Sequence, residues 1–74
     1  MLEINRTDFR YRIEKDEKLL AYNVITAKMY FFIGNTKEYL LNKLYDKKND
    51  IELEEKYINY LLENNVLRRI WNGI

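Results

Sequence analysis

The order of apolar and polar residues predicts three short strands at the start of the chain. Residues 8–14 alternate apolar and charged side chains, which is typical of a half-buried strand. A charged turn at 15–18 leads to a second apolar run, 19–25, and a short link leads to a third, Met29 to Ile33. Because links this short join antiparallel neighbours, we expect an antiparallel meander.

The pattern then changes to helical spacing. Gly34 interrupts the third strand, and Asn35 is a candidate N-cap, with Glu38 three residues later completing a capping box. Apolar residues recur at helical spacing up to Leu44 and Tyr45, opposite a polar side. A first helix is therefore predicted directly after the third strand.

A second helix is predicted after the polar break at 46–50. Asn49 or Asp50 is its candidate cap, and three glutamates occupy its expected first turn, where the helix dipole favours negative charge: Glu52, Glu54 and Glu55. A wide apolar stripe follows, and 63–65 is expected to end the helix; residues 66–71 are either a short extension or an extra strand. We thus expect one α+β domain over residues 1–74, with its core at about 8–70.

The amino-acid composition excludes several kinds of catalytic and ligand-binding site. The 74 residues contain no Cys and no His, which excludes disulfides, ordinary zinc sites and the commonest catalytic groups. With only two glycines there is no glycine-rich phosphate loop. Glu52 and Glu54 are two residues apart on the predicted helix, so they do not face a shared ion. We expect a protein that is not an enzyme and holds no metal or cofactor.

The net charge and the hydropathy of the chain argue against two classes of binding partner, nucleic acids and membranes. A net charge of +1 is low for a dedicated nucleic-acid binder. No apolar run approaches the roughly 20 residues that span a bilayer, and the N-terminus lacks the regions of a signal peptide. We expect a cytoplasmic protein that does not contact membranes.

Non-catalytic binding is the function class that remains. Three sequence features favour it, and each of them also has an explanation in which it only supports the fold. The aromatic strand 29–33 is either a core strand or a sheet edge that accepts a peptide. The tyrosines of the last helix either complete the core or offer rings to a partner. The scattered basic residues are either solvated surface or contacts for an acidic peptide: Arg10, Arg12, Lys28, Lys56, Arg68 and Arg69.

Four segments together resemble the PqqD-like family, the precursor peptide recognition elements of ribosomally synthesised and post-translationally modified peptides (RiPPs). They read FRYRIEK, LLAYN, MYFFIGNTKEYLLNKL and INYLLENNVL, and they extend from about Phe9 to Leu67. The resemblance implies a winged-helix-like fold, with a three-stranded antiparallel sheet followed by two or three helices. One departure is that 46–51 is too short for the helix that the family usually carries there.

The resemblance also implies a function. Such domains act as peptide chaperones: the leader of a precursor peptide adds as a strand beside the third strand, against the last helix, and a modifying enzyme, often a radical SAM protein, then acts on the core peptide. Carried over to this chain, the peptide-binding residues are Lys28, Met29, Tyr30, Phe31, Phe32, Ile33, Lys56, Tyr57, Tyr60, Leu61 and Asn64.

Two other functions remain open. A winged-helix DNA-binding domain has the same architecture, although the last helix is rich in glutamate. A generic small protein–protein adaptor, whose partner covers the aromatic strand, is hard to distinguish from a peptide binder. An apolar edge strand is also able to pair with its own copy, which would give a homodimer.

Overall fold

The computed structural model describes residues 1–71; the last three residues of the predicted domain, 72–74, lie outside this part. The chain forms an α+β fold, as expected, with two antiparallel sheets and two helices among the described residues. In chain order the elements are β1 (Leu2–Ile4), β2 (Phe9–Ile13), β3 (Leu19–Asn23), β4 (Met29–Phe32), α1 (Gly34–Leu44), α2 (Glu55–Glu63) and β5 (Leu67–Arg69).

The larger sheet has the predicted meander topology. Its strand order is β2–β3–β4, and its register aligns Tyr11 with Ala21 and Ala21 with Tyr30. Because side chains alternate across a strand, this row and the rows two residues away share one face. That face carries Phe9, Leu19 and Phe32, which are buried in the core.

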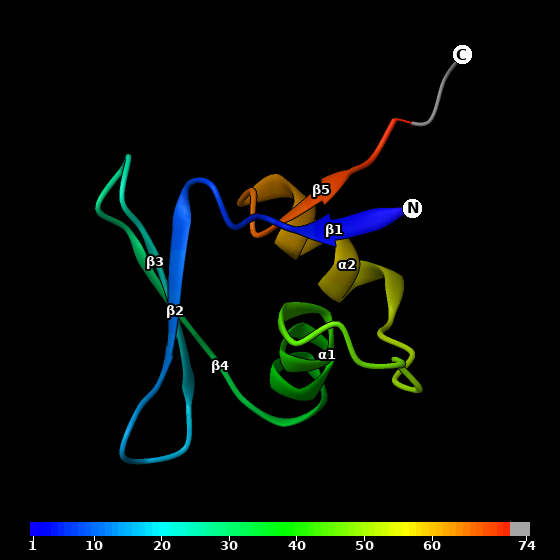
Figure 1. The fold of residues 1–74 in the computed structure, drawn as a ribbon, viewed down its shortest axis with the longest axis horizontal. Coiled ribbons are helices and arrows are strands. Elements are labelled where there is room, and N and C mark those ends of the chain that lie inside the picture. Colours follow the sequence, from blue (N-terminus) through cyan, green and yellow to red (C-terminus); the bar gives the residue numbers. More distant parts are fainter. Residues whose placement is uncertain (72–74) are drawn as a thin grey trace.

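Both helices and the smaller sheet lie on one side of the larger sheet (Figure 1). The core forms between these layers and includes Leu40 of α1, Leu61 of α2 and Leu67 of β5. Among residues 1–71, no element covers the opposite face of the larger sheet (Figure 1). The larger sheet therefore has one packed face and one open face.

The smaller sheet was only partly anticipated. The segment 66–71, left open as a helix extension or a strand, contains β5, and β5 pairs with β1 in register Glu3↔Arg68. The sequence analysis missed β1 because three residues are too few to show a period-two pattern. Pairing with β1 places β5 away from β4, so the C-terminal strand does not cover the edge of β4.

The predicted capping box of α1 is wrong. The helix begins at Gly34, its N-cap is Ile33 in an extended conformation, and no side chain caps it. Gly34 has φ of +60°, a left-handed conformation that glycine adopts without a steric penalty, and so the chain turns from strand to helix within one residue. Asn35 consequently lies inside the helix and not at its boundary.

The start of α2 also differs from the prediction. The helix begins at Glu55 with Glu54 as N-cap, so Glu52 lies outside it, and neither Asn49 nor Asp50 caps it. Asn49 instead donates to the carbonyl of Tyr39 at 3.0 Å and accepts from Asn42 at 3.3 Å, which fastens the loop to α1. Residues 45–54 contain no helix, and α2 ends at Glu63, as predicted.

Within residues 1–71, neither helix is long and apolar enough to cross a membrane.

Candidate binding groove

Strand β4 has a free edge. It pairs with β3 on one side, and no strand of the described chain lies on its other side. The amide of Asn23 donates to the carbonyl of Lys28 at 2.8 Å. Because antiparallel bonding alternates between residues, Tyr30 and Phe32 also direct their main-chain groups to β3, whereas Met29 and Phe31 direct their N–H and C=O groups outward.

A groove runs beside this free edge. It has a volume of about 470 Å³ and is formed by the end of β4, the start of α1 and the exposed side of α2. Phe32 and Leu61 are buried, whereas Tyr57 and Tyr60 are about half exposed. Its lining residues are Phe31, Phe32, Ile33, Thr36, Lys56, Tyr57, Tyr60 and Leu61. The groove is therefore apolar, with one basic side chain and no carboxylate in its lining.

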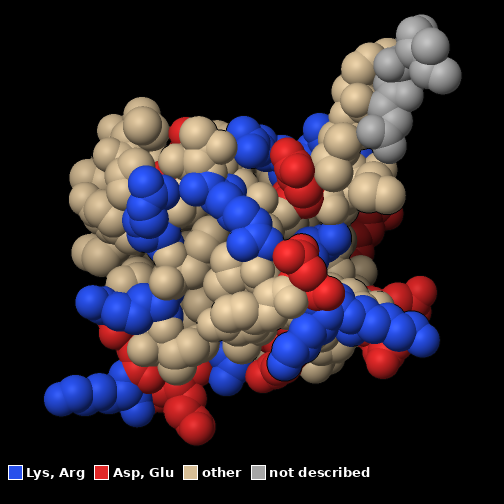
Figure 2. All heavy atoms as spheres, in the orientation of Figure 1, with Lys and Arg blue, Asp and Glu red and all other residues tan. Residues whose placement is uncertain are grey.

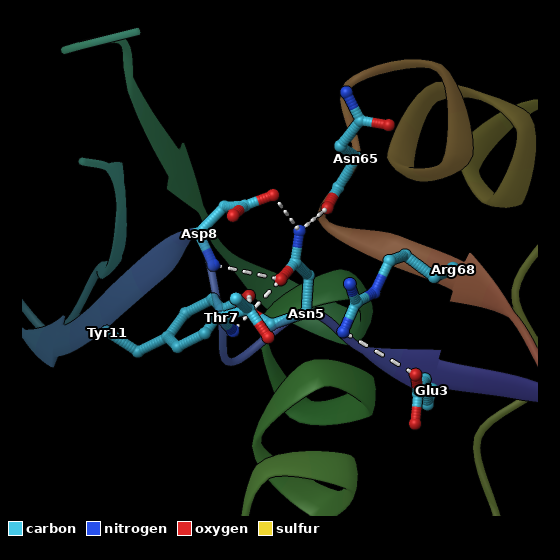
Figure 3. A network of polar contacts seen from close by, with 7 residues as sticks. All are labelled: Glu3, Asn5, Thr7, Asp8, Tyr11, Asn65 and Arg68. Atoms are coloured by element: carbon cyan, nitrogen blue, oxygen red, sulfur yellow. Dashed lines mark hydrogen bonds and ion pairs between the residues drawn. The ribbon is translucent and has the colours of Figure 1, made fainter. Parts of the chain in front are cut away.

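The buried end of α2 is fixed by a polar network around Asn5, which is fully buried (Figure 3). Its Nδ2 donates to the carbonyl of Asn65, just after α2, at 2.9 Å and to Asp8 at 3.2 Å. Its Oδ1 accepts from the amides of Thr7 and Asp8 at 3.0 and 3.1 Å. One side chain thus joins the end of α2 to the start of β2.

Tyr11 extends this network to the middle of β2. Its hydroxyl donates to the carbonyl of Asn5 at 2.7 Å (Figure 3). Burial raises the pKa of Tyr11 well above its ordinary value, against the smaller opposing effects of Arg6 and Arg68. The phenol therefore keeps its proton at neutral pH and serves as a structural donor.

One hydrogen bond connects β4 and α2 outside the lining of the groove. The Tyr30 hydroxyl donates to Oδ1 of Asn64 at 3.3 Å, and the Tyr30 ring packs against Phe9 with a centroid distance of 6.0 Å. Asn64 also donates to the carbonyl of Tyr60 at 2.9 Å, which holds its amide in place. The start of β4 is thereby joined to the end of α2, and the two elements run in opposite directions.

One end of the groove carries charge. The Lys56 ammonium lies over the Tyr57 ring, 5.1 Å from its centroid, and 3.7 Å from a Glu54 carboxylate oxygen. A second hollow of about 410 Å³ adjoins the groove through Ile33, Thr36 and Tyr57, and its lining includes Glu52 and Glu54. Because this ion pair is exposed, it contributes little to stability.

The structure brings most of the predicted site residues together. The groove is lined by seven of them: Phe31, Phe32, Ile33, Lys56, Tyr57, Tyr60 and Leu61. Tyr30 and Asn64 do not line it, although a hydrogen bond joins them. Lys28 and Met29 do not line it: Lys28 precedes β4 at the turn, and Met29 belongs to the open face of the sheet. The sequence analysis missed Thr36, whose place in the lining depends on how α1 begins.

A charged hollow of about 500 Å³ lies elsewhere, between β1 and α1. Three of its four basic side chains, those of Arg6, Lys43 and Arg68, already have partners within the chain; the fourth is Lys47. Arg6 donates to the carbonyls of Lys43 and Leu44, Lys43 donates to the carbonyl of Leu2, and Arg68 lies 3.6 Å from Glu3. These side chains hold α1 and the smaller sheet together, so the groove beside β4 is the better candidate for a binding site.

Comparisons with protein-family models, curated proteins and solved structures gave no significant match.

Proposed function

We propose that this chain is a non-catalytic binding domain that captures the leader segment of a RiPP precursor peptide. The leader adds as a strand to β4, and the domain presents it to a modifying enzyme. The observation that carries this proposal is the free, uncharged edge of β4 beside an apolar groove. Strand addition uses main-chain hydrogen bonds for affinity and side-chain pockets for specificity.

The edge of β4 has the groups that strand addition needs. Met29 and Phe31 offer outward donors and acceptors, while Tyr30 and Phe32 hold the strand against β3. A peptide residue opposite Phe32 would place its side chain on the groove side, towards Tyr60 and Leu61. Burial of an apolar side chain there contributes about 1.5–3 kcal/mol at most.

The residue pattern that resembles the PqqD-like family agrees with this function. We propose that the fold is a reduced winged-helix-like domain, in which α1 and α2 are joined by a loop at 45–54 where the family usually has a helix. On this account the protein works in the cytoplasm with a separate or fused enzyme, often of the radical SAM class. Holding the leader raises the effective concentration of the core peptide at the enzyme.

The charges support peptide over DNA as the ligand. In α2, Glu55 and Glu63 oppose the single Lys56, so the helix would repel phosphate. On the face seen in Figure 2, basic and acidic side chains are interspersed and do not form one basic patch.

Peptide titration of matched tyrosine variants tests the proposal. Tyr60 lines the groove and is 48% exposed, whereas Tyr45 lies outside the groove and is 60% exposed. Calorimetry with the leader segment of the cognate precursor peptide should show binding about tenfold weaker for Tyr60→Ala. Tyr45→Ala should bind like the wild type. Equal affinity in all three proteins would contradict the proposal.

A further inference from the structure

The open face of the larger sheet is unusually apolar on the side of β4. Antiparallel sheets with one packed face normally present polar side chains on the other. Here the open face carries Met29 and Phe31 of β4, which are 58% and 55% exposed, and Phe31 also borders the groove at the free edge. Leu20 lies opposite Phe31 on β3 and is only 7% exposed.

Charged side chains adjoin both exposed residues of β4 on this face: Met29 shares a hollow with Arg10 and Arg12, and Phe31 shares one with the charged turn at 15–18. Arg10 and Arg12 belong to β2, and the pairing Arg12↔Leu20↔Phe31 places the width of β3 between them and β4. Arg12 is moreover paired with Glu14 at 3.1 Å. The side chains that β4 itself presents on the open face, next to the free edge, are therefore apolar, and the charged side chains around them belong to β2 and to the turn at 15–18.

The register of β4 determines where the side chains of an added strand would go. Met29 and Phe31 are the residues with outward main-chain groups, so they would form the hydrogen-bonded pairs with a peptide. In such pairs the two side chains stand on the same face, with their Cβ atoms about 5 Å apart. Peptide residues opposite Met29 and Phe31 would thus lie on the open face, and those between would enter the groove.

We infer that the Met29 and Phe31 side chains on the open face are a second part of the peptide site, covered by the outward side chains of the same peptide. This inference rests on the proposed function and adds a substrate class. The preferred peptide carries apolar residues at consecutive positions, because both faces of the added strand meet apolar surface. A strand with apolar residues only on the groove side would leave Met29 and Phe31 uncovered.

Two other occupants fit less well. A nucleic acid would stack bases on the aromatic rings and place phosphates near Arg10 and Arg12, but Arg12 is already paired with Glu14. A second protein would need no continuity with the edge of β4. Met29 and Phe31, by contrast, are exposed on the strand whose main chain is free.

A selection experiment tests the inference without knowledge of the natural peptide. A library of random nine-residue peptides is selected against the whole chain, and bound peptides are located by NMR on the amides of residues 29–33. We expect the bound peptides to carry apolar residues at both odd and even positions of the paired segment. Alternation of apolar and polar residues would overturn the inference and leave the proposed function intact.

A matched set of variants then assigns the effect to Phe31. Two versions of the best peptide are compared. One has valine at the positions opposite Met29 and Phe31, and the other has threonine there, which has nearly the same shape and strand preference. Wild type should bind the threonine version about fivefold more weakly per position. Phe31→Thr should remove this difference, whereas Tyr22→Thr, on the same face of β3, should keep it.

The outcomes separate the two claims. If Phe31→Thr and wild type discriminate equally, the open face is not part of the site, although the edge still accepts peptide. If selected peptides perturb no amide of residues 29–33, both claims fail. Binding of single-stranded DNA or of a second copy at Phe31 in place of peptide would also overturn the inference.

Discussion

The two edges of the larger sheet are chemically different although both belong to short strands. On β2 the bonds from Val24 to Asp8 and from Glu14 to Lys18 turn the main-chain groups of Phe9, Tyr11 and Ile13 outward. A charged side chain lies along this edge. The Arg10 guanidinium donates to the carbonyl of Phe9 at 3.0 Å and also to the carbonyls of Arg6 and Thr7. On β4, residues 29–32 carry no charge at all.

The two edges differ in how well they are protected against pairing with another chain. Proteins ordinarily protect an edge strand with charged side chains or with a covering segment, because free donors and acceptors pair readily with other chains. The edge of β2 has this protection. The edge of β4 lacks it and lies beside an apolar groove, and the proposed strand addition rests on this difference.

The largest expected effect concerns the buried network that ties β2 to the end of α2. Asn5→Ala would leave the carbonyl of Asn65 and the amides of Thr7 and Asp8 without their partner. The free energy of unfolding should fall by about 2–4 kcal/mol, measured by urea denaturation. Thr7→Ala, at the exposed neighbour, should change it by about 0.5 kcal/mol at most; a similar loss in both variants would contradict the assigned role of Asn5.

Proline at the two edges separates their functions directly. Proline removes one main-chain donor and is tolerated where that donor points away from the sheet. Phe31→Pro on β4 should weaken peptide binding about tenfold or more, because it removes an outward N–H group. Ile13→Pro on β2 should leave affinity unchanged. Calorimetry measures both, with circular dichroism as the check on folding, and weakened binding in Ile13→Pro would count against the comparison.

The ends of β4 offer a paired test of backbone strain. Ala27 and Gly34 flank the strand, and both have positive φ, +64° and +60°. Gly34→Ala should destabilise the protein by about 1–2 kcal/mol even though a Cβ there meets no atom within 4 Å. Ala27→Gly should be neutral or stabilising by up to about 1 kcal/mol. Thermal unfolding checks both signs, and equal losses would show that strain is not the cause.

The smallest expected effect concerns Arg10, the charged side chain along the edge of β2. Arg10→Ala would free the carbonyl of Phe9 and leave β2 with less charge along its edge. We expect a stability loss of about 1 kcal/mol or less, together with weak self-association that grows with concentration. Sedimentation velocity measures the association, and Lys15→Ala, in the adjoining turn, serves as the control. A strictly monomeric Arg10→Ala protein would show that the charge does not protect this edge.

The sequence determined the meander well because its signals are local. The alternation in 8–14 and the short links around 15–18 and 26–28 identify β2, β3 and β4, and the helical spacing identifies α1 and α2. The capping residues were wrong because caps compete with tertiary contacts: Gly34 turns the chain earlier than a cap at Asn35 would, and Asn49 bonds to α1. Local pattern does not reveal that competition.

The sequence predicted most of the residues that form the walls of the candidate site, but it did not predict how these residues are arranged in space. The apolar residues of 29–33 and the tyrosines of the last helix identify the groove lining. That β5 pairs with β1, and so leaves β4 free, depends on two three-residue strands with no distinctive pattern. The outward direction of the main-chain groups of Met29 and Phe31 depends on the bonding pattern between β3 and β4, which the bond between Asn23 and Lys28 indicates.

Amide hydrogen exchange on the peptide-bound protein tests the central claim most directly. The amides of Met29 and Phe31 point outward, and those of Tyr30 and Phe32 already bond to β3. On addition of the leader peptide, exchange should slow strongly at Met29 and Phe31, with no comparable change at Tyr11 and Ile13 on the β2 edge. Protection at the β2 edge, or unchanged exchange at Met29 and Phe31 with peptide bound, would contradict strand addition to β4.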